Sequence, residues 1–305
     1  MRKKVFSLFA LMLFAATGAL AQGTVTIKEG TADADKWTVK SGTTTVVLGE
    51  TEVAKDATVT ATYSGTRHVK SVTAVVKGGA EETVTLATPL TLEALSDGTI
   101  VVKTPKSGMQ YTLNGGTKTA VTEDAISVTA GDKVQFYGQG TTLTSYYGTK
   151  IAGGTAQTKV YGNIMSLVDE TGYATNYTTL SGEKVFYGLF LFNSTLTDAS
   201  GLLLPATTLV ESCYAYLFRG CDALTAAPEL PATILTESCY YNMFTQCAKL
   251  NAVTCLATDI SASYCTDYWL TDVSATGTLT TPASTAWTTN SESGIPTGWT
   301  RVNAE

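Results

Sequence analysis

The chain has 305 residues, a formal net charge of −6 at pH 7 and a single histidine. This length exceeds that of one small domain and accommodates two or three. An acidic chain without a cluster of lysine and arginine is poorly suited to nucleic acid or an anionic membrane, because both need concentrated positive charge. We therefore expect neither as a partner.

Residues 1–21 have the features of a cleavable secretory signal peptide. Basic residues at positions 2–4 precede the apolar run "VFSLFALMLFAA", and "ALA" at positions 19–21 matches an A-x-A cleavage site. The run is shorter than the ~20 residues that a membrane-spanning helix needs. Cleavage after Ala21 leaves 17 basic against 26 acidic residues, a charge of −9. We predict an exported protein, secreted or at the cell surface, that does not insert into a membrane after cleavage.

Two segments of alternating polarity follow, at residues 22–87 and 88–165. In the first, "TVTIK", "ATVTATYSG" and "HVKSVTAVVK" put apolar and polar side chains on opposite faces, as half-buried strands do. In the second, "TIVVK" and "AISVTAGDKVQFYG" repeat this pattern, and Asn114-Gly115 indicates a hairpin with a type I′ turn. Such strands predict small antiparallel β-sandwiches. Whether residues 22–165 form one such domain or two stays open.

Residues 166–283 carry an internal repeat. "LPATTLVESCYAYLFRGCDALTAAPE", from Leu204, and "LPATILTESCYYNMFTQCAKLNAVTC", from Leu230, match position by position at a period of 26 residues, and weaker copies lie on either side. A fixed period in the twenties is typical of a solenoid, here of about four units. Residues 284–305 are predicted to form a C-terminal cap or tail.

Each repeat unit is predicted to contain one short helix and one short strand. Five apolar side chains of the second copy are spaced as on one face of a helix: Cys239, Tyr240, Met243, Phe244 and Cys247. Leu250 and Ala252 continue with the rhythm of a short parallel strand, and the proline of "LPAT" ends the element that precedes it.

The core pattern "CYxxMFxxCxxL", the "LPAT" linkers and the tail "SGIPTGWT" resemble the BspA-like leucine-rich-repeat surface proteins of gut and oral Bacteroidetes. The resemblance covers residues 186–305. It implies an N-terminal all-β part followed by a short α/β leucine-rich-repeat-like solenoid, and export to the cell envelope or beyond. Some members of this family act as adhesins for host proteins or other bacteria, and many have no assigned activity.

Six cysteines in an exported chain are compatible with a disulfide framework. Two cysteines eight residues apart on a helix, however, would be separated by about 12 Å along the axis, beyond the roughly 7 Å limit for a bridge. Asn193 and Val273 occupy a cysteine position in the outer copies, which indicates a packing position. We interpret the six as buried core side chains, with a bridge such as Cys255–Cys265 as the alternative. The absence of a C-x-x-C pattern argues against zinc.

The sequence offers few candidates for catalysis. His68 lies beside Arg67 and Lys70 on an alternating segment, which favours a solvated position, and no second histidine can complete a catalytic triad. The paired carboxylates that a glycosidase needs occur as adjacent residues at 81–82 and 169–170, in turn-like segments. We therefore expect no catalytic residues, no cofactor and no metal site.

Three tyrosines of the repeats fall outside the core stripe: Tyr216, Tyr241 and Tyr268. Exposed tyrosines are favoured at protein interfaces and also stack on sugar rings, although tyrosine also covers repeat faces without binding anything. We hypothesise a binding or adhesion protein that recognises a host or microbial protein through this row. The alternative is a glycan-binding protein in which the β domains hold carbohydrate and the solenoid is a spacer.

Overall fold

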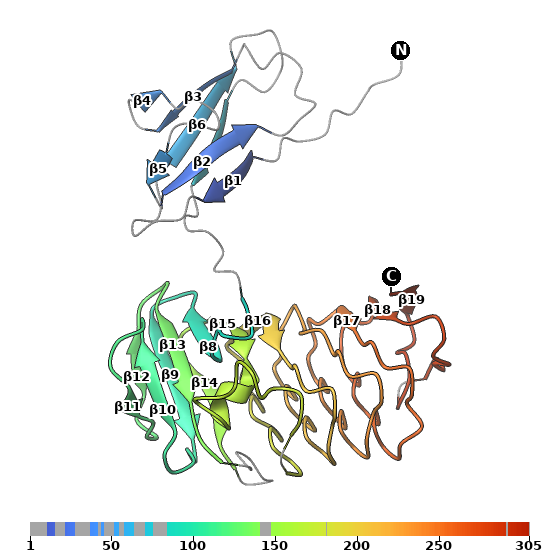
Figure 1. The fold of residues 1–305 in the computed structure, drawn as a ribbon. Coiled ribbons are helices and arrows are strands. Elements are labelled where there is room, and N and C mark those ends of the chain that lie inside the picture. Colours follow the sequence, from blue (N-terminus) through green and yellow to red (C-terminus); the bar gives the residue numbers. More distant parts are fainter. Residues whose placement is uncertain are drawn as a thin grey trace, which may run out of the picture. The chain divides into compact units, whose positions relative to one another are not determined.

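The structure is a computed structural model that describes residues 84–140, 148–180, 182–290 and 292–304, together with seven strands between residues 11 and 75. The chain divides into two compact units, residues 1–83 and residues 84–305, labelled by strand in Figure 1. Each unit is described by itself below.

The first unit contains two antiparallel sheets. One has the order β1-β2-β5 and the other the order β4-β3-β6-β7. The strands are β1 (Leu11–Ala15), β2 (Gln22–Ile27), β3 (Trp37–Ser41), β4 (Thr44–Thr45), β5 (Glu52–Ala54), β6 (Thr58–Tyr63) and β7 (Ser71–Val75). The alternating segments thus form the predicted strands β2, β6 and β7.

Strand β1 lies within the predicted signal peptide and pairs with β2 at the edge of its sheet. Cleavage after Ala21 stays a prediction. Because β1 is an edge strand, such a cleavage would remove it and leave β2 paired with β5.

The second unit begins with two sheets, ordered β11-β10-β13-β8-β15-β16 and β12-β9-β14. The strands are β8 (Thr91–Ala94), β9 (Gly98–Lys103), β10 (Gln110–Leu113), β11 (Thr119–Ala120), β12 (Ile126–Val128), β13 (Lys133–Tyr137), β14 (Lys150–Gly154), β15 (Thr158–Asn163) and β16 (Leu196–Leu203). A 3₁₀ helix, η2 (Ile164–Leu167), follows β15. Buried side chains from both sheets, such as Leu92, Val134 and Ile100, belong to one core, which fits the predicted β-sandwich.

The predicted hairpin turn after β10 is confirmed. Asn114 and Gly115 both have positive φ values, 54° and 71°, as a type I′ turn requires. The N–H of Gly116 closes the turn by donating to Leu113 O at 2.9 Å, and β10 pairs with β11 beyond it.

The strands of this β part are continuous with the repeats. β15 pairs in parallel with β16, which belongs to the first of the repeated segments. The structure therefore joins residues 84–305 in one compact unit, where the sequence predicts a boundary between residues 165 and 166. It divides the chain between residues 83 and 84, four residues before the other predicted boundary.

The helix predicted within each repeat is wrong. No α-helix occurs among the described residues. Instead, residues with positive φ recur at every fourth position of each copy: Ser212, Tyr216 and Gly220, then Ser238, Asn242 and Gln246, then Tyr264, Tyr268 and Asp272.

The backbone hydrogen bonds show what replaces the helix. The N–H of Ala215 donates to Ser212 O, three residues back, whereas the N–H of Tyr214 donates to Cys239 O in the next copy, at 3.1 Å. These two kinds of bond alternate along the segment, and neither is the bond to the fourth preceding residue that defines an α-helix. Each copy is therefore a coil of consecutive turns, bonded sideways to the next coil.

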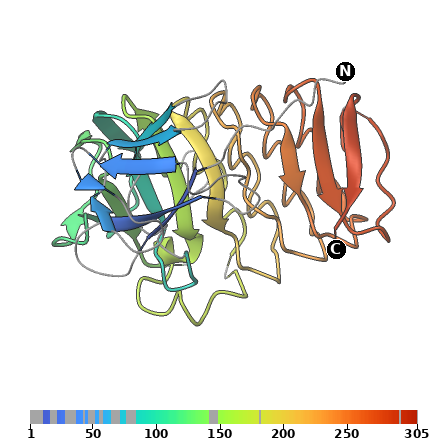
Figure 2. The same ribbon diagram turned by 90° about the horizontal axis from the view of Figure 1, so that it is seen from above.

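Short parallel strands close the later coils. They are β17 (Ala252–Thr254), β18 (Gly277–Thr281) and β19 (Trp299–Asn303), which lie side by side in Figure 2 in the order β17-β18-β19. The short parallel strand predicted around Ala252 is thus present. The predicted C-terminal cap contributes β19, the last layer of this sheet.

Equivalent side chains of successive coils pack in columns. The rings of Phe190, Phe218 and Phe244 stack with centroid distances of 5.3 and 5.5 Å, and Tyr214 lies between Phe186 and Tyr240 in a second column. The described part of the chain is thus almost entirely β and turn, and it contains no helix long and apolar enough to cross a membrane.

Candidate functional site

The cysteines lie in the core of the stacked coils. All six are buried and unpaired, including Cys255 and Cys265. Burial raises the pKa of Cys213, Cys247 and Cys255 to about 12, so these thiols are neutral at ordinary pH. Their interpretation as core side chains is confirmed.

At one of the cysteine positions of the repeat, the side chain also donates a hydrogen bond to the preceding coil. The thiol of Cys221 donates to Phe190 O at 3.0 Å, and the thiol of Cys247 donates to Phe218 O at 3.1 Å. Asn193, at the same position of the first coil, donates through its side-chain amide to Ile151 O at 3.1 Å. Three of the four copies thus place a donor at this position, whereas Val273 occupies it in the last copy.

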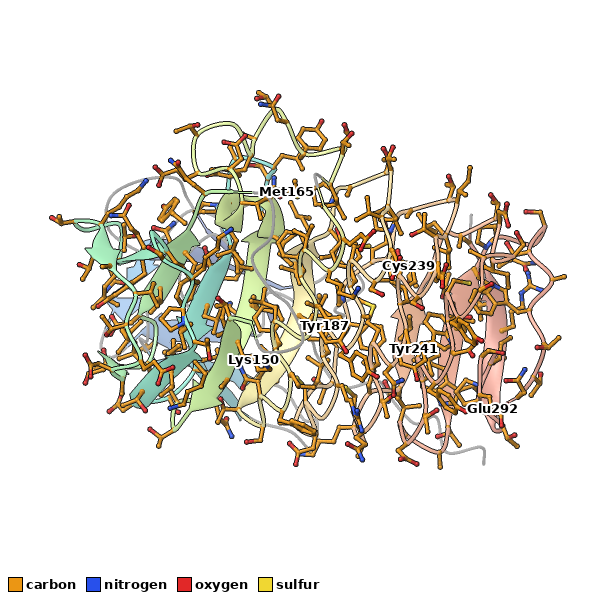
Figure 3. All side chains as sticks on the ribbon, turned by 90° about the horizontal axis from the view of Figure 1, so that it is seen from below. Lys150, Met165, Tyr187, Cys239, Tyr241 and Glu292 are labelled. Carbon is orange, nitrogen blue, oxygen red and sulfur yellow. The ribbon has the colours of Figure 1, made fainter. Side chains whose placement is uncertain are left out.

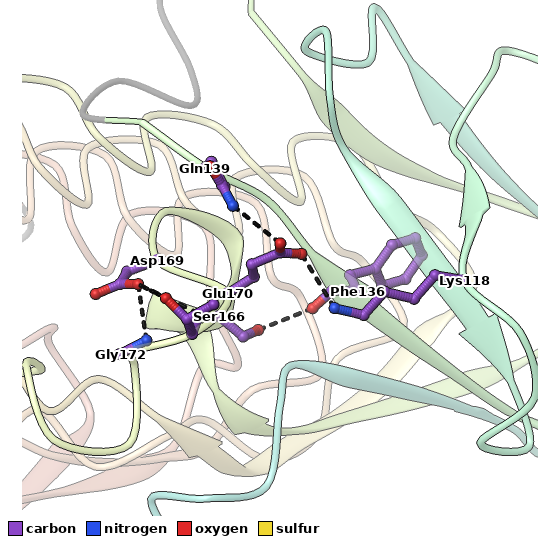
Figure 4. A network of polar contacts seen from close by, with 8 residues as sticks. Lys118, Phe136, Gln139, Ser166, Asp169, Glu170 and Gly172 are labelled. Carbon is purple, nitrogen blue, oxygen red and sulfur yellow. Dashed lines mark hydrogen bonds and ion pairs between the residues drawn. The ribbon is translucent and has the colours of Figure 1, made fainter.

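The adjacent carboxylates at residues 169–170 serve local structure, as Figure 4 shows. Asp169 accepts hydrogen bonds from the Gly172 N–H at 2.8 Å and from Thr171. Glu170 pairs with Lys118 at 3.1 Å and accepts from Gln139. These partners lower the pKa of both carboxyl groups, whereas a glycosidase acid needs a raised pKa.

The remaining catalytic candidates lie outside the described residues. This applies to His68 and to the carboxylates at 81–82. Within the described ranges, no group of three or more histidine, cysteine or acidic side chains is arranged to hold a metal ion.

The structure brings the three predicted tyrosines together. The ring centroids of Tyr216 and Tyr241 lie 5.4 Å apart, and those of Tyr241 and Tyr268 lie 6.2 Å apart. Tyr216 and Tyr241 are half-buried, and Tyr268 is 41% exposed. The three tyrosines belong to successive coils. The backbone also joins these coils, since the N–H of Tyr216 donates to Tyr241 O.

A fourth ring, that of Tyr187, extends the row at its N-terminal end. Its centroid lies 4.9 Å from that of Tyr216. Sequence reasoning missed Tyr187, although the repeat register aligns it with Ala215 and therefore with Tyr241, and this shared position is the signal that could have found it. We call Tyr187, Tyr216, Tyr241 and Tyr268 the tyrosine row. In Figure 3, Tyr187 and Tyr241 follow one another along the length of the unit.

The row differs from the buried aromatic columns in its ring geometry. The planes of Phe218 and Phe244 differ by 2°, whereas those of Tyr216 and Tyr241 differ by 66° and those of Tyr241 and Tyr268 by 87°. Partial burial, with a smaller effect of neighbouring Tyr241, raises the pKa of Tyr216. The tyrosine row therefore presents tilted rings at a partly exposed surface.

The cationic side chain of Arg219 lies beside the tyrosine row. The guanidinium carbon of Arg219 lies 5.4 Å from the centroid of the Tyr216 ring and 5.9 Å from that of Phe192, which is 56% exposed. Cation–π contacts of this kind hold a guanidinium over an aromatic face. Tyrosine and arginine are both enriched at protein interfaces.

Comparisons with protein-family models, with curated proteins and with solved structures return no match for this chain.

Proposed function

We propose that this chain is an exported, non-enzymatic recognition protein that binds a host or microbial protein through the tyrosine row. The observation that carries the proposal is the tyrosine row itself. Successive coils each place a tyrosine next to the ring of the previous one at an accessible surface, while the other aromatic columns of the coils are buried. Amphipathic aromatic side chains at the surface are typical of protein-binding sites.

We further propose that the stacked coils form a solenoid of the BspA-like leucine-rich-repeat kind. The in-register hydrogen bonds between copies, such as that from the Phe218 N–H to Met243 O at 2.9 Å, support a repeating stack. The turn backbone replaces the helix that the family resemblance implies. The extended surfaces of such stacks commonly bind other proteins.

The test replaces three of the four rings of the tyrosine row by residues that should leave the fold intact. The repeats themselves supply the replacement residues: Asn242 occupies the position equivalent to Tyr216 and Tyr268, and Ala215 occupies the position equivalent to Tyr241. A triple variant Tyr216→Asn, Tyr241→Ala, Tyr268→Asn therefore keeps residues that these coils accept. Thermal unfolding of the variant provides the folding control.

Binding is measured on panels of immobilised host extracellular proteins, of bacterial surface proteins and of soluble glycans. We expect the wild type to bind at least one protein, and the triple variant to bind it about tenfold more weakly or worse, because tyrosine hot spots contribute about 2 kcal/mol or more. Equal protein binding by both chains would contradict the proposal. Glycan binding that survives in the triple variant would favour carbohydrate recognition by the β domains.

A further inference from the structure

The position of Arg219 is particular to one coil. Thr245 and Thr271 occupy the equivalent positions of the next two copies. The residue after the arginine, Gly220, is Gln246 and Asp272 in those copies. A Cβ atom at Gly220 would lie 2.2 Å from the Phe192 ring, so the glycine makes room for the ring that flanks the guanidinium.

The guanidinium has no anionic partner within the described residues. The ion pairs found there involve lysines, namely Lys118, Lys159 and Lys184. Asp222, three residues after Arg219, does not pair with it. The Nε of Arg219 is buried and has no hydrogen-bond partner. A guanidinium offers five donors in a planar fork that matches a carboxylate, and here the fork is partly desolvated and held by two rings.

The ring geometry of the row favours a peptide over a sugar. Stacking of a pyranose needs a ring face that is open to the ligand, whereas two of the three successive pairs in the tyrosine row meet edge to face, at 66° and 87°, and the third is tilted by 40°. Their hydroxyl groups and edges suit the amides and side chains of a polypeptide. Charge complementarity then adds a carboxylate opposite Arg219.

We propose that the tyrosine row binds an acidic peptide segment, with an aspartate or glutamate carboxylate of the partner held by Arg219. This inference rests on the proposed function, because it names the chemistry of the protein partner at the same surface. Arg219 anchors the acidic side chain through a charge-assisted fork, and the tyrosines bury the neighbouring residues of the segment.

The experiment uses the full chain on an array of short synthetic peptides of random sequence. Each peptide is printed beside a copy in which every aspartate and glutamate is replaced by asparagine and glutamine. Wild type is compared with Arg219→Gln, with the triple tyrosine variant and with Lys249→Gln. Lys249 is an exposed lysine of the second copy, so this last variant controls for the loss of one positive charge.

We expect bound peptides to be acidic and their amide copies to bind about tenfold more weakly or worse. Arg219→Gln should remove this preference, Lys249→Gln should keep it, and added salt should weaken it.

Equal binding of acidic and amide copies, or an unchanged preference in Arg219→Gln, would overturn the inference while leaving the tyrosine row as the binding surface. Unchanged binding by the triple variant would instead overturn the proposed function. A wild type that binds no peptide would overturn the peptide inference alone, because the protein panel tests the proposed function separately.

Discussion

In the antiparallel part of the second unit, Leu92 of β8 faces Val134 of β13 across a ladder of neighbouring strands. In the stacked coils, by contrast, Phe218 contacts Phe190 and Phe244, its own equivalents one coil away. The antiparallel part thus fills its core with different aliphatic side chains whose shapes complement one another. The stacked coils fill theirs with columns of like side chains, so a single substitution changes a column that several coils share.

The largest expected difference between the two regions is the loss of stability of the stacked coils at alkaline pH, because all six cysteines lie in the coils. Burial raises the pKa of Cys213, Cys247 and Cys255 from 9.0 to about 12. The folded state thus favours the protonated thiols, and stability should be unaffected below about pH 9 and fall as the pH rises to about 12. Each thiol should cost about 1.4 kcal/mol per pH unit in that window. Guanidinium unfolding at several pH values measures the slope.

A single substitution isolates one thiol in this experiment. The hydroxyl groups of the buried Tyr214 and Tyr240 act in the same direction at higher pH, since burial raises their pKa as well. The variant Cys255→Ala should therefore show a smaller slope than wild type by the share of one thiol. Parallel pH curves for the two chains would contradict the assignment of a raised pKa to this position.

Removing one ring from a column should have the next largest effect. Phe218→Ala deletes a fully buried ring between two others, and we expect it to lower the free energy of unfolding by about 3–5 kcal/mol. Phe136→Ala, at a fully buried position of β13, is the matched control in the antiparallel part.

A double-mutant cycle distinguishes the regions. The substitutions of Phe218 and Phe244 should couple by about 0.5–1.5 kcal/mol, whereas those of Phe218 and Phe136 should be additive. Additivity for both pairs would argue against the column.

The smallest effect is expected in the tyrosine row. Tyr216 has a φ of 59°, a conformation that asparagine tolerates and β-branched residues do not. Tyr216→Asn should therefore change the free energy of unfolding by less than about 1 kcal/mol, whereas Tyr216→Val should lower it by about 1–2 kcal/mol more. Chemical denaturation of both variants makes the comparison. A larger loss for asparagine than for valine would contradict the turn backbone of the coil.

The strands and the hairpin turn could be predicted because their signals are local. The alternating segments and Asn114-Gly115 act over a few residues, and the structure has strands and a type I′ turn there. The burial of Cys239, Tyr240, Met243, Phe244 and Cys247 was predictable as well, and all five are buried.

The backbone that buries those five side chains was not predictable. Turns that recur every four residues place side chains at offsets 0, 1, 4, 5 and 8, and a helix of 3.6 residues per turn gives the same offsets over so short a stretch. The positive φ values that distinguish the two fall on residues such as Tyr216 and Gln246, which carry no turn signal in the sequence. The contact of Arg219 with the tyrosine row was missed because the repeat register compares equivalent positions, and the next two copies carry threonine at this position.

The most direct test of the stacked coils is a count of reactive thiols in the purified chain, without reductant. We expect six thiols to react with a thiol-specific reagent after unfolding, and almost none to react while the chain is folded, because all six are buried and unpaired. Fewer than six thiols in the unfolded chain would reveal disulfides, and rapid reaction of the folded chain would reveal exposed cysteines. Either result would contradict a core built from stacked coils.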